Sequence, residues 1–128
     1  IVSHADLGRE FLNAAELIVG RLEAADAVSI QASTDCQELL EEIASKIKAL
    51  NQGEGVLVLT DMFGGTPSNV SLSFLNDEKV EVLTGVNLSM VIAVSESRGR
   101  MNLQELGEKA QEAGQSSINL ASKLLKSG

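Results

Sequence analysis

The central stretch of the chain, residues 56–69, reads VLVLTDMFGGTPSN and decides the fold class. Its first four residues are continuously apolar, which is typical of a central parallel strand covered on both faces. Two glycines follow, and then Thr66 and Pro67 predict the start of a helix, with the threonine as N-cap and the proline at the first helical position. The stretch therefore predicts a strand, a tight loop and a helix in succession.

Strand-like and helix-like segments alternate on both sides of this stretch. Residues 1–2 and 27–30 are expected to be strands before it, and residues 80–83 a strand after it. Apolar residues at helical spacing predict helices over residues 7–22, from residue 36 to a glycine stop at 53, over residues 88–94, and from residue 103. Polar residues suited to capping these helices are Asp6, Thr34, Asp35 and Asn102.

This alternation predicts a single α/β domain over residues 1–128, with a doubly wound, mainly parallel sheet. Residues 117–120 alternate apolar and polar side chains, so a fifth, antiparallel edge strand is possible there. Functional sites of such sheets lie beyond the carboxyl ends of the strands, where the strand order reverses. In the order 2-1-3-4, the loops after strands one and three are neighbours at that point, and they carry His4 and Asp61.

Composition excludes several classes of function. The net charge of −8 disfavours nucleic acid, and the absence of Trp and Tyr leaves few aromatic faces on which bases or sugars could stack. No apolar run is long enough to insert into a membrane. One Cys and one His disfavour a metal site, and no nucleotide-binding fingerprint occurs, so we expect no cofactor. The lone cysteine suits a cytoplasmic protein.

His4, the only histidine, is the candidate nucleophile. If Asp61 accepts a hydrogen bond from Nδ1–H, Nε2 keeps a free lone pair that can attack phosphorus. The carboxylate would also stabilise the positive imidazole that forms during the attack. The alternative is that His4 is an ordinary loop residue and Asp61 a capping residue.

The loop after Asp61 is the candidate phosphoryl-binding site. Gly64 and Gly65 allow a tight turn that presents backbone N–H groups, the following helix contributes its positive end, and Thr66 and Ser68 offer hydroxyl groups. A plain loop with a helix cap would have the same sequence. Two apolar side chains on the same loop belong either to the core or to a face that contacts a partner protein, namely those of Met62 and Phe63.

Three segments resemble the mannose-family IIA component of the bacterial phosphotransferase system. They are IVSH at residues 1–4 with the helix after it, VLVLTDMFGGTPSN at residues 56–69, and GVNLSM at residues 85–90. The resemblance covers essentially the whole chain and implies a homodimer of flavodoxin-like subunits with a fifth strand near the C-terminus, and it leaves open whether that strand is exchanged between the subunits. The chain departs from the family pattern at Ala5, where glycine is common. We therefore expect an energetic cost if the backbone at this position needs a positive φ.

The resemblance also implies a function. His4 matches the phosphorylated histidine, Asp61 its orienting carboxylate and Thr66 a hydroxyl residue near the phosphoryl group. The donor would be the carrier HPr and the acceptor a IIB component, in sugar uptake. Two alternatives remain: a regulatory module that is phosphorylated as a signal, and the phosphocarrier subunit of a phosphotransferase-dependent dihydroxyacetone kinase. A flavodoxin-type nucleotide- or flavin-binding domain is disfavoured by the missing fingerprint and aromatic residues.

Overall fold

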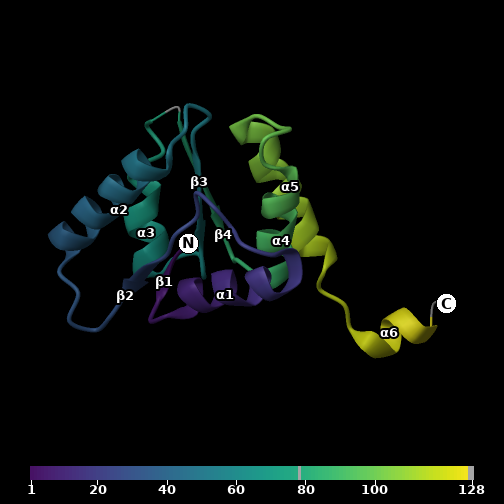
Figure 1. Ribbon diagram of the computed structural model, residues 1–128. Coiled ribbons are helices and arrows are strands. Elements are labelled where there is room, and N and C mark those ends of the chain that lie inside the picture. Colours follow the sequence, from purple (N-terminus) through teal and green to yellow (C-terminus); the bar gives the residue numbers. More distant parts are fainter. Residues whose placement is uncertain (78, 127–128) are drawn as a thin grey trace.

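A computed structural model of the chain describes residues 1–77 and 79–126, and it confirms the predicted α/β fold (Figure 1). Four parallel strands form one sheet in the order β2-β1-β3-β4. The strands are β1 (Val2–His4), β2 (Val28–Ile30), β3 (Val56–Thr60) and β4 (Val80–Thr84). The helices are α1 (Leu7–Val19), α2 (Cys36–Leu50), α3 (Thr66–Leu72), α4 (Leu88–Ser97), α5 (Leu103–Ser116) and α6 (Ala121–Lys126).

Helices cover both faces of the sheet, and each face has its own apolar core (Figure 1). Alternate side chains of β3 enter the two cores. Val58 packs on the side of α2 and α3, whereas Leu59 packs on the side of α1, α4 and α5. This explains why β3 has no polar face. The first core contains Val2, Val28, Ile30, Leu39, Ile43, Val58, Val70 and Val80, and the second contains Leu12, Ala15, Leu59, Val86, Met90, Val91 and Ala110.

The ends of three helices differ from the sequence prediction. The first helix ends at Val19, short of residue 22, because Gly20 leaves the helical conformation with φ 87°. The second ends at Leu50, and the side chain of Asn51 closes the turn by accepting the N–H of Gly53. The third begins at Thr66 itself, since the carbonyl of Gly65 accepts the first helical hydrogen bond, from the N–H of Asn69. Thr66 is therefore not the N-cap.

The N-cap of α5 confirms the prediction at Asn102. Its side chain accepts from the N–H of Glu105, whose carboxylate accepts in return from the Asn102 N–H, so the two residues form a capping box. Asp6 and Asp35 also occupy N-cap positions, but neither side chain makes a capping hydrogen bond. For α1, a different side chain caps the first turn, as described with the active site below.

The C-terminal segment differs most from the prediction. Residues 117–120 form no strand; they lead from α5 to α6, a short helix that the sequence analysis did not predict. Figure 1 shows α6 lying apart from the layered body. Its sequence ASKLLK consists mostly of good helix formers, whereas residues 117–120 pair with none of the four described strands, and an unpaired strand is not stable by itself. We call residues 117–126 the C-terminal arm.

None of the helices among the described residues combines the length and the apolar character needed to cross a bilayer.

Candidate active site

The parallel sheet brings His4 and Asp61 together at its carboxyl edge. His4 is the last residue of β1, and Asp61 directly follows β3, the neighbouring strand. The two strands pair at Val2 and Thr60, so both side chains lie just beyond the pairing. The switch point of the sheet therefore holds the two residues that the sequence analysis selected.

One carboxylate oxygen holds His4 at two points. Asp61 Oδ2 lies 2.8 Å from the backbone nitrogen of His4 and 2.8 Å from its ring nitrogen Nδ1. The other oxygen, Oδ1, accepts from the N–H of Met62 at 2.9 Å. The His4 side chain is 48% exposed while that of Asp61 is only 10% exposed, so the carboxylate supports the ring from below and leaves it open to solvent.

The ionised state of the Asp61 carboxylate determines the tautomer of His4. Burial by itself would raise the pKa of the Asp61 carboxyl, but hydrogen bonds from the His4 backbone and ring, attraction to His4 and the Met62 N–H together hold that pKa below its usual range. An ionised carboxylate only accepts hydrogen bonds, so Nδ1 is the protonated nitrogen of the neutral ring. Nε2 is consequently the nitrogen with a free lone pair.

Hydrogen bonds from the next strand hold the end of β3 in position. The carbonyl of Thr60 accepts two backbone N–H groups from the turn after β4, those of Gly85 and Val86, each at 2.9 Å. Thr60 is fully buried. The residue that carries the carboxylate is thus attached to a rigid, buried strand end, which favours a constant position for Asp61.

The glycines after Asp61 serve two different purposes. Gly64 turns the chain with φ 88°, a conformation that side chains with a Cβ rarely adopt. Gly65 is needed for space, because a Cβ at this position would lie 3.1 Å from Cε1 of His4 and 3.4 Å from Cγ of Met62. The loop therefore packs its backbone directly against the imidazole ring.

We expect Gly65→Ala to disturb the His4–Asp61 pair while leaving the fold intact. The added methyl group would contact Cε1, the ring carbon between the two nitrogens, and displace the ring from Asp61. Phosphorylation of His4 should slow by about tenfold, the scale expected when a reacting group is misplaced by a fraction of an ångström. Gly107→Ala is the matched control, since Gly107, like Gly65, has no positive φ, and its Cβ would meet only Cγ of Glu81, at 3.4 Å. Equal rates for the two variants would show that the ring tolerates the methyl group.

The two predicted hydroxyl residues of the loop lie in different environments. Thr66 is exposed at the start of α3, on the same loop as Gly65. Ser68 is fully buried, and its hydroxyl has no hydrogen-bond partner among the described residues, as is also the case for the hydroxyl groups of Thr60 and Ser71. Of the two predicted residues, Thr66 is the one that solvent reaches.

Ser3 is a structural residue of the site that the sequence analysis missed. Its hydroxyl accepts from the N–H of Gly8 at 2.8 Å and so caps the first turn of α1 instead of Asp6, whose carboxylate accepts from the hydroxyl of Ser29. Ser3 is fully buried beside His4. A side chain that reaches forward five residues to cap a helix leaves no regular sequence signature.

Ala5 takes the left-handed conformation that the sequence analysis identified as a possible cost. Its φ is 48°, and its N–H donates to the carbonyl of Ile30 at 2.9 Å, which fixes the chain as it leaves His4. For a residue with a Cβ this conformation costs roughly 1–2 kcal/mol.

We expect Ala5→Gly to stabilise the protein by about 0.5–1 kcal/mol, because the relief of this strain exceeds the extra chain entropy that glycine loses on folding. Urea unfolding of the variant and the original chain measures the difference. Ala32→Gly is the control, since Ala32 is exposed and has no positive φ, and it should be destabilising. A lower midpoint for both variants would contradict the assignment of strain to Ala5.

Exposed apolar side chains occur on the two segments that follow His4 and Asp61. Met62 is 54% exposed and Phe63 74% exposed on the loop after Asp61, and Leu7, at the start of α1, is 49% exposed. None of the three belongs to either apolar core. The loop side chains are therefore on the surface, which was one of the two positions expected for them.

Fold and site together define a class of protein: a doubly wound α/β domain whose carboxyl edge presents a carboxylate-held histidine, with exposed apolar side chains on the segments that follow His4 and Asp61. Comparison with known proteins identifies the family. The family described as "PTS system fructose IIA component" matches residues 1–111. The chain belongs to this family of phosphotransferase-system IIA components of sugar uptake, which are phosphotransferase proteins.

Individual relatives agree with this assignment. The chain is 29% identical over 126 residues to the PTS system fructose-specific EIIA component of Bacillus subtilis, covering 98% of this chain and 86% of that protein. It is 28% identical to part of the mannose-specific EIIAB component of Escherichia coli, covering 92% of this chain and 37% of that protein. The crystal structure of phosphotransferase system component EIIA from Streptococcus agalactiae superimposes with a TM-score of 0.87 at 28% identity, covering 95% of each chain.

Proposed function

We propose that this protein is a phosphocarrier that accepts a phosphoryl group on Nε2 of His4 from an HPr-like donor and passes it to a IIB component. The observation that carries the proposal is the hydrogen bond between His4 Nδ1 and Asp61 Oδ2, which orients the ring with Nε2 away from the carboxylate. Membership in a family of IIA components supports it. The sugar is left open, because the relatives are named for different sugars.

The proposed transfer needs no proton to leave the attacking nitrogen. The lone pair of Nε2 forms a bond to phosphorus while the bond between phosphorus and the donor's histidine breaks, and the electron pair of that bond returns to the donor ring. The His4 ring then carries a positive charge, with its proton still on Nδ1. Asp61 stabilises that charge at 2.8 Å, and the onward transfer to IIB reverses the same sequence.

The loop after Asp61 is the proposed binding site for the phosphoryl oxygens. Gly65 packs against Cε1 of the ring, and Gly64 and the exposed Thr66 are its neighbours in the loop. Ser68 contributes to this site only if the loop shifts, because its hydroxyl is buried. Backbone N–H donors suit a phosphoryl group because they supply hydrogen bonds without requiring a positive side chain.

Met62 and Phe63 are proposed to contact the partner proteins. Apolar side chains that are more than half exposed beside a reacting group are a common centre of protein-protein interfaces. A docked partner would also exclude water from the phosphohistidine during transfer.

Phosphoryl transfer with purified components tests the proposal. Incubation with labelled phosphoenolpyruvate, enzyme I and HPr should label this chain, and addition of a IIB component should move the label onward. Label that reaches this chain but never leaves it would contradict the carrier function and favour a regulatory module. No labelling at all would contradict the assignment of His4.

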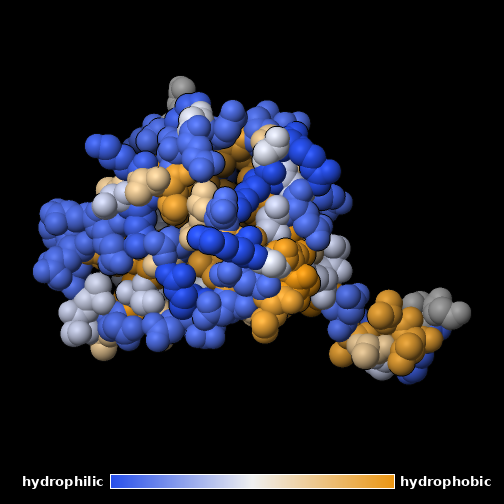
Figure 2. Space-filling view, in the orientation of Figure 1, coloured by the Kyte–Doolittle hydropathy of each residue, from blue (hydrophilic) through white to orange (hydrophobic). Residues whose placement is uncertain are grey.

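We further propose that the protein is a homodimer joined through its C-terminal arms. Four apolar side chains of the arm are exposed, as Figure 2 shows for the segment lying apart from the body; they are Ile118 at 78%, Leu120 at 64%, Leu124 at 57% and Leu125 at 80%. β4 is the last strand of the sheet and has a free outer edge. The arm of a second copy could cover that edge and bury its own apolar side chains there.

Sedimentation at micromolar concentration should show a dimer. The double change Ile118→Asp and Leu120→Asp should yield monomers, because it introduces two charges where the arm would be buried. Ser122→Asp, at a polar position of the same arm, is the control and should leave the dimer intact. A monomeric original chain would contradict the proposal.

A further inference from the structure

The side chain of Asn87 makes hydrogen bonds at the ends of two helices. Its Oδ1 atom accepts from the N–H of Met90 at 2.9 Å, which makes Asn87 the N-cap of α4. Its Nδ2 atom donates to the carbonyl of Gly114 at 3.0 Å and to the hydroxyl oxygen of Ser117 at 3.3 Å. One amide group therefore closes the start of α4 and the end of α5.

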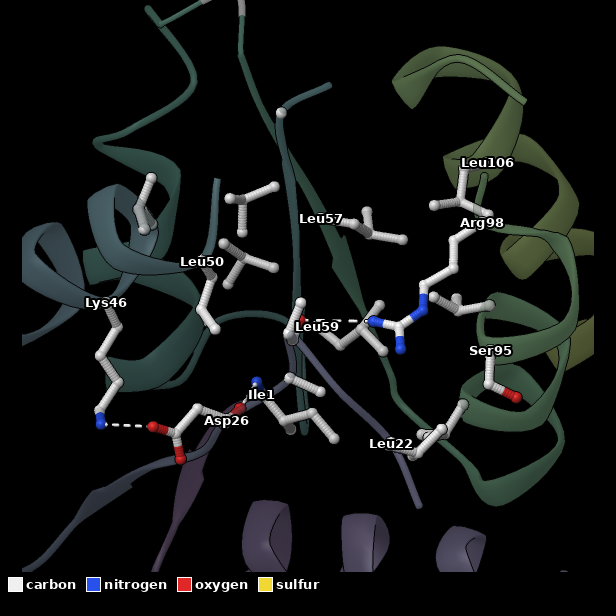
Figure 3. A pocket seen from close by; sticks show the side chains of 18 of the residues that line it. Ile1, Leu22, Asp26, Lys46, Leu50, Leu57, Leu59, Ser95, Arg98 and Leu106 are labelled. Carbon is white, nitrogen blue, oxygen red and sulfur yellow. Dashed lines mark hydrogen bonds and ion pairs between the residues drawn. The ribbon is translucent and has the colours of Figure 1, made fainter. Parts of the chain in front are cut away.

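The last turn of α5 lies beside the start of α4, at the carboxyl edge of the sheet. Nearer its other end, Figure 3 shows Leu106 of α5 in the wall of a cavity of about 450 Å³ next to Ile1. The end of α5 approaches α4 so closely that a Cβ on Gly114 would lie 2.7 Å from Cε of the buried Met90. The lack of a side chain at Gly114 thus lets the Asn87 amide reach the helix backbone.

This amide contact fixes the root of the C-terminal arm. Ser117, the first residue of the arm, accepts from Asn87 and donates its own hydroxyl to the carbonyl of Gly114 at 2.8 Å. Beyond it, the N–H of Ile118 reaches back only to Gln115, at 3.4 Å. The direction in which the arm leaves α5 is therefore set at Ser117, with a hydrogen bond from a separate part of the chain.

Asn87 itself is attached to a rigid part of the domain. It directly follows Gly85 and Val86, whose N–H groups both donate to the carbonyl of the buried Thr60 at the end of β3. Its own carbonyl accepts from the N–H of Val91 in α4. The root of the arm is consequently tied to the sheet through a side chain that has little freedom to move.

Capping α4 does not by itself require an amide. An N-cap uses only an acceptor, which serine or aspartate supplies about as well as asparagine. The NH₂ group of Asn87 takes no part in that cap and makes both contacts with the end of α5. Asn102 caps α5 through its oxygen in the same way, but its NH₂ group makes no hydrogen bond within the described part of the chain. The donor half of Asn87 therefore serves the arm.

We propose that Asn87 is a positioning residue for assembly: by holding the root of the arm, it determines how tightly two copies of the chain associate. The inference rests on the proposed homodimer, in which the arm of each copy docks on the other. A segment whose root is already fixed loses less conformational freedom on docking than one that swings freely. Asn87 strengthens association by preorganising the arm.

Asn87→Ser tests this function. Serine still caps α4 through its hydroxyl oxygen, but its side chain is too short to reach Gly114 and Ser117. Sedimentation over a concentration series should give a dimer dissociation constant at least about tenfold higher than that of the original chain, because the root must now be ordered on docking. Asn102→Ser is the matched control: it keeps a capping box with Glu105, so its dimer should be as tight as the original.

A second pair of variants changes only exposed side chains at the end of α5. Ser117→Ala removes the acceptor of the Asn87 hydrogen bond and should weaken the dimer about threefold, since the bond from Asn87 to Gly114 remains. Ser116→Ala, at the neighbouring position, removes a hydroxyl that bonds to the carbonyl of Ala113 and should leave the dimer unchanged. Both serines are exposed, so both variants should fold like the original chain.

Amide hydrogen exchange locates the effect in the monomer. The N–H of Ser117 bonds to the carbonyl of Gln115. When Asn87→Ser is added to the monomeric chain with Ile118→Asp and Leu120→Asp, this N–H should exchange at least about fivefold faster. The N–H of Met90, whose cap is retained, should change little.

The possible failures give different results. A monomeric original chain would contradict the homodimer and the function of Asn87 together. A stable dimer with the same dissociation constant for Asn87→Ser, or for Ser117→Ala, as for the original chain would overturn the function of Asn87 alone. Equal weakening by Asn87→Ser and Asn102→Ser would assign the effect to helix capping in general, and unchanged exchange at Ser117 would assign it to another part of the chain; either result would overturn the proposal.

Discussion

His4→Ala is expected to abolish acid-labile phosphorylation of this chain completely. No other imidazole exists in the sequence to accept the group, and His4 is the residue whose ring the sheet edge presents with Nε2 free. After incubation with phosphoenolpyruvate, enzyme I and HPr, the intact mass of the original chain should increase by one HPO₃ group. The mass of the variant should stay unchanged.

His4→Asn separates loss of chemistry from loss of structure. The amide nitrogen of asparagine can replace Nδ1–H as a donor to Asp61, so the support beneath the loop is retained while the nucleophile is removed. Both variants should unfold at urea concentrations close to that of the original chain, because His4 is about half exposed and belongs to neither core. A phosphoryl adduct that persists on either folded variant would contradict the assignment of His4.

The fold was predictable because its signals are local. β3 is a continuous apolar run, the helices carry apolar stripes, and short strands alternating with helices leave few topologies. The carboxyl edge of a parallel sheet then limits the site to the loops after neighbouring strands. His4 and Asp61 lie on two such loops, which is why their proximity could be expected from the sequence alone.

The remaining features depend on contacts between distant segments. The capping of α1 by Ser3 requires the exact path of the chain after β1, and the need for glycine at position 65 arises from the His4 ring, which comes from another strand. Residues 117–120 have the alternation of a strand but pair with none of the four strands in the described part of the chain, so their pattern alone gave a wrong prediction for the single chain. Sequence patterns report what a segment prefers, whereas these features depend on its neighbours.

Asp61→Asn is expected to keep the fold and to slow phosphoryl transfer to His4 by at least about tenfold. Three donors converge on this carboxylate: the backbone N–H and ring Nδ1–H of His4 on Oδ2, and the N–H of Met62 on Oδ1. An amide has only one acceptor oxygen, so one of its two ends must face a donor with its NH₂ group. With NH₂ toward His4, Nδ1 has to give up its proton, and the ring adopts the wrong tautomer.

The other orientation of the amide should reduce the transfer rate less. With NH₂ toward Met62, the oxygen still accepts from His4 and the tautomer is kept, at the cost of one unpaired N–H. The negative charge is nevertheless gone, so the positive ring that forms as phosphorus is attacked is stabilised less. The same substitution in a serine protease triad lowers kcat by about 10⁴-fold, and this value is an upper limit for the loss of rate expected here. The loss here should be smaller, because the attacking imidazole sheds no proton from Nε2.

Rapid-quench transfer from phosphorylated HPr, measured beside a urea melt, distinguishes this function of Asp61 from a purely structural one. Asp35→Asn is the matched control: it removes the same charge from an exposed residue at the N-cap of α2, where the side chain makes no capping hydrogen bond. If Asp61 only supports the loop, its variant should lose about 1 kcal/mol of stability and little rate. A slow transfer with a nearly unchanged midpoint, seen for Asp61→Asn but not for Asp35→Asn, is the result that the two-point contact with His4 predicts.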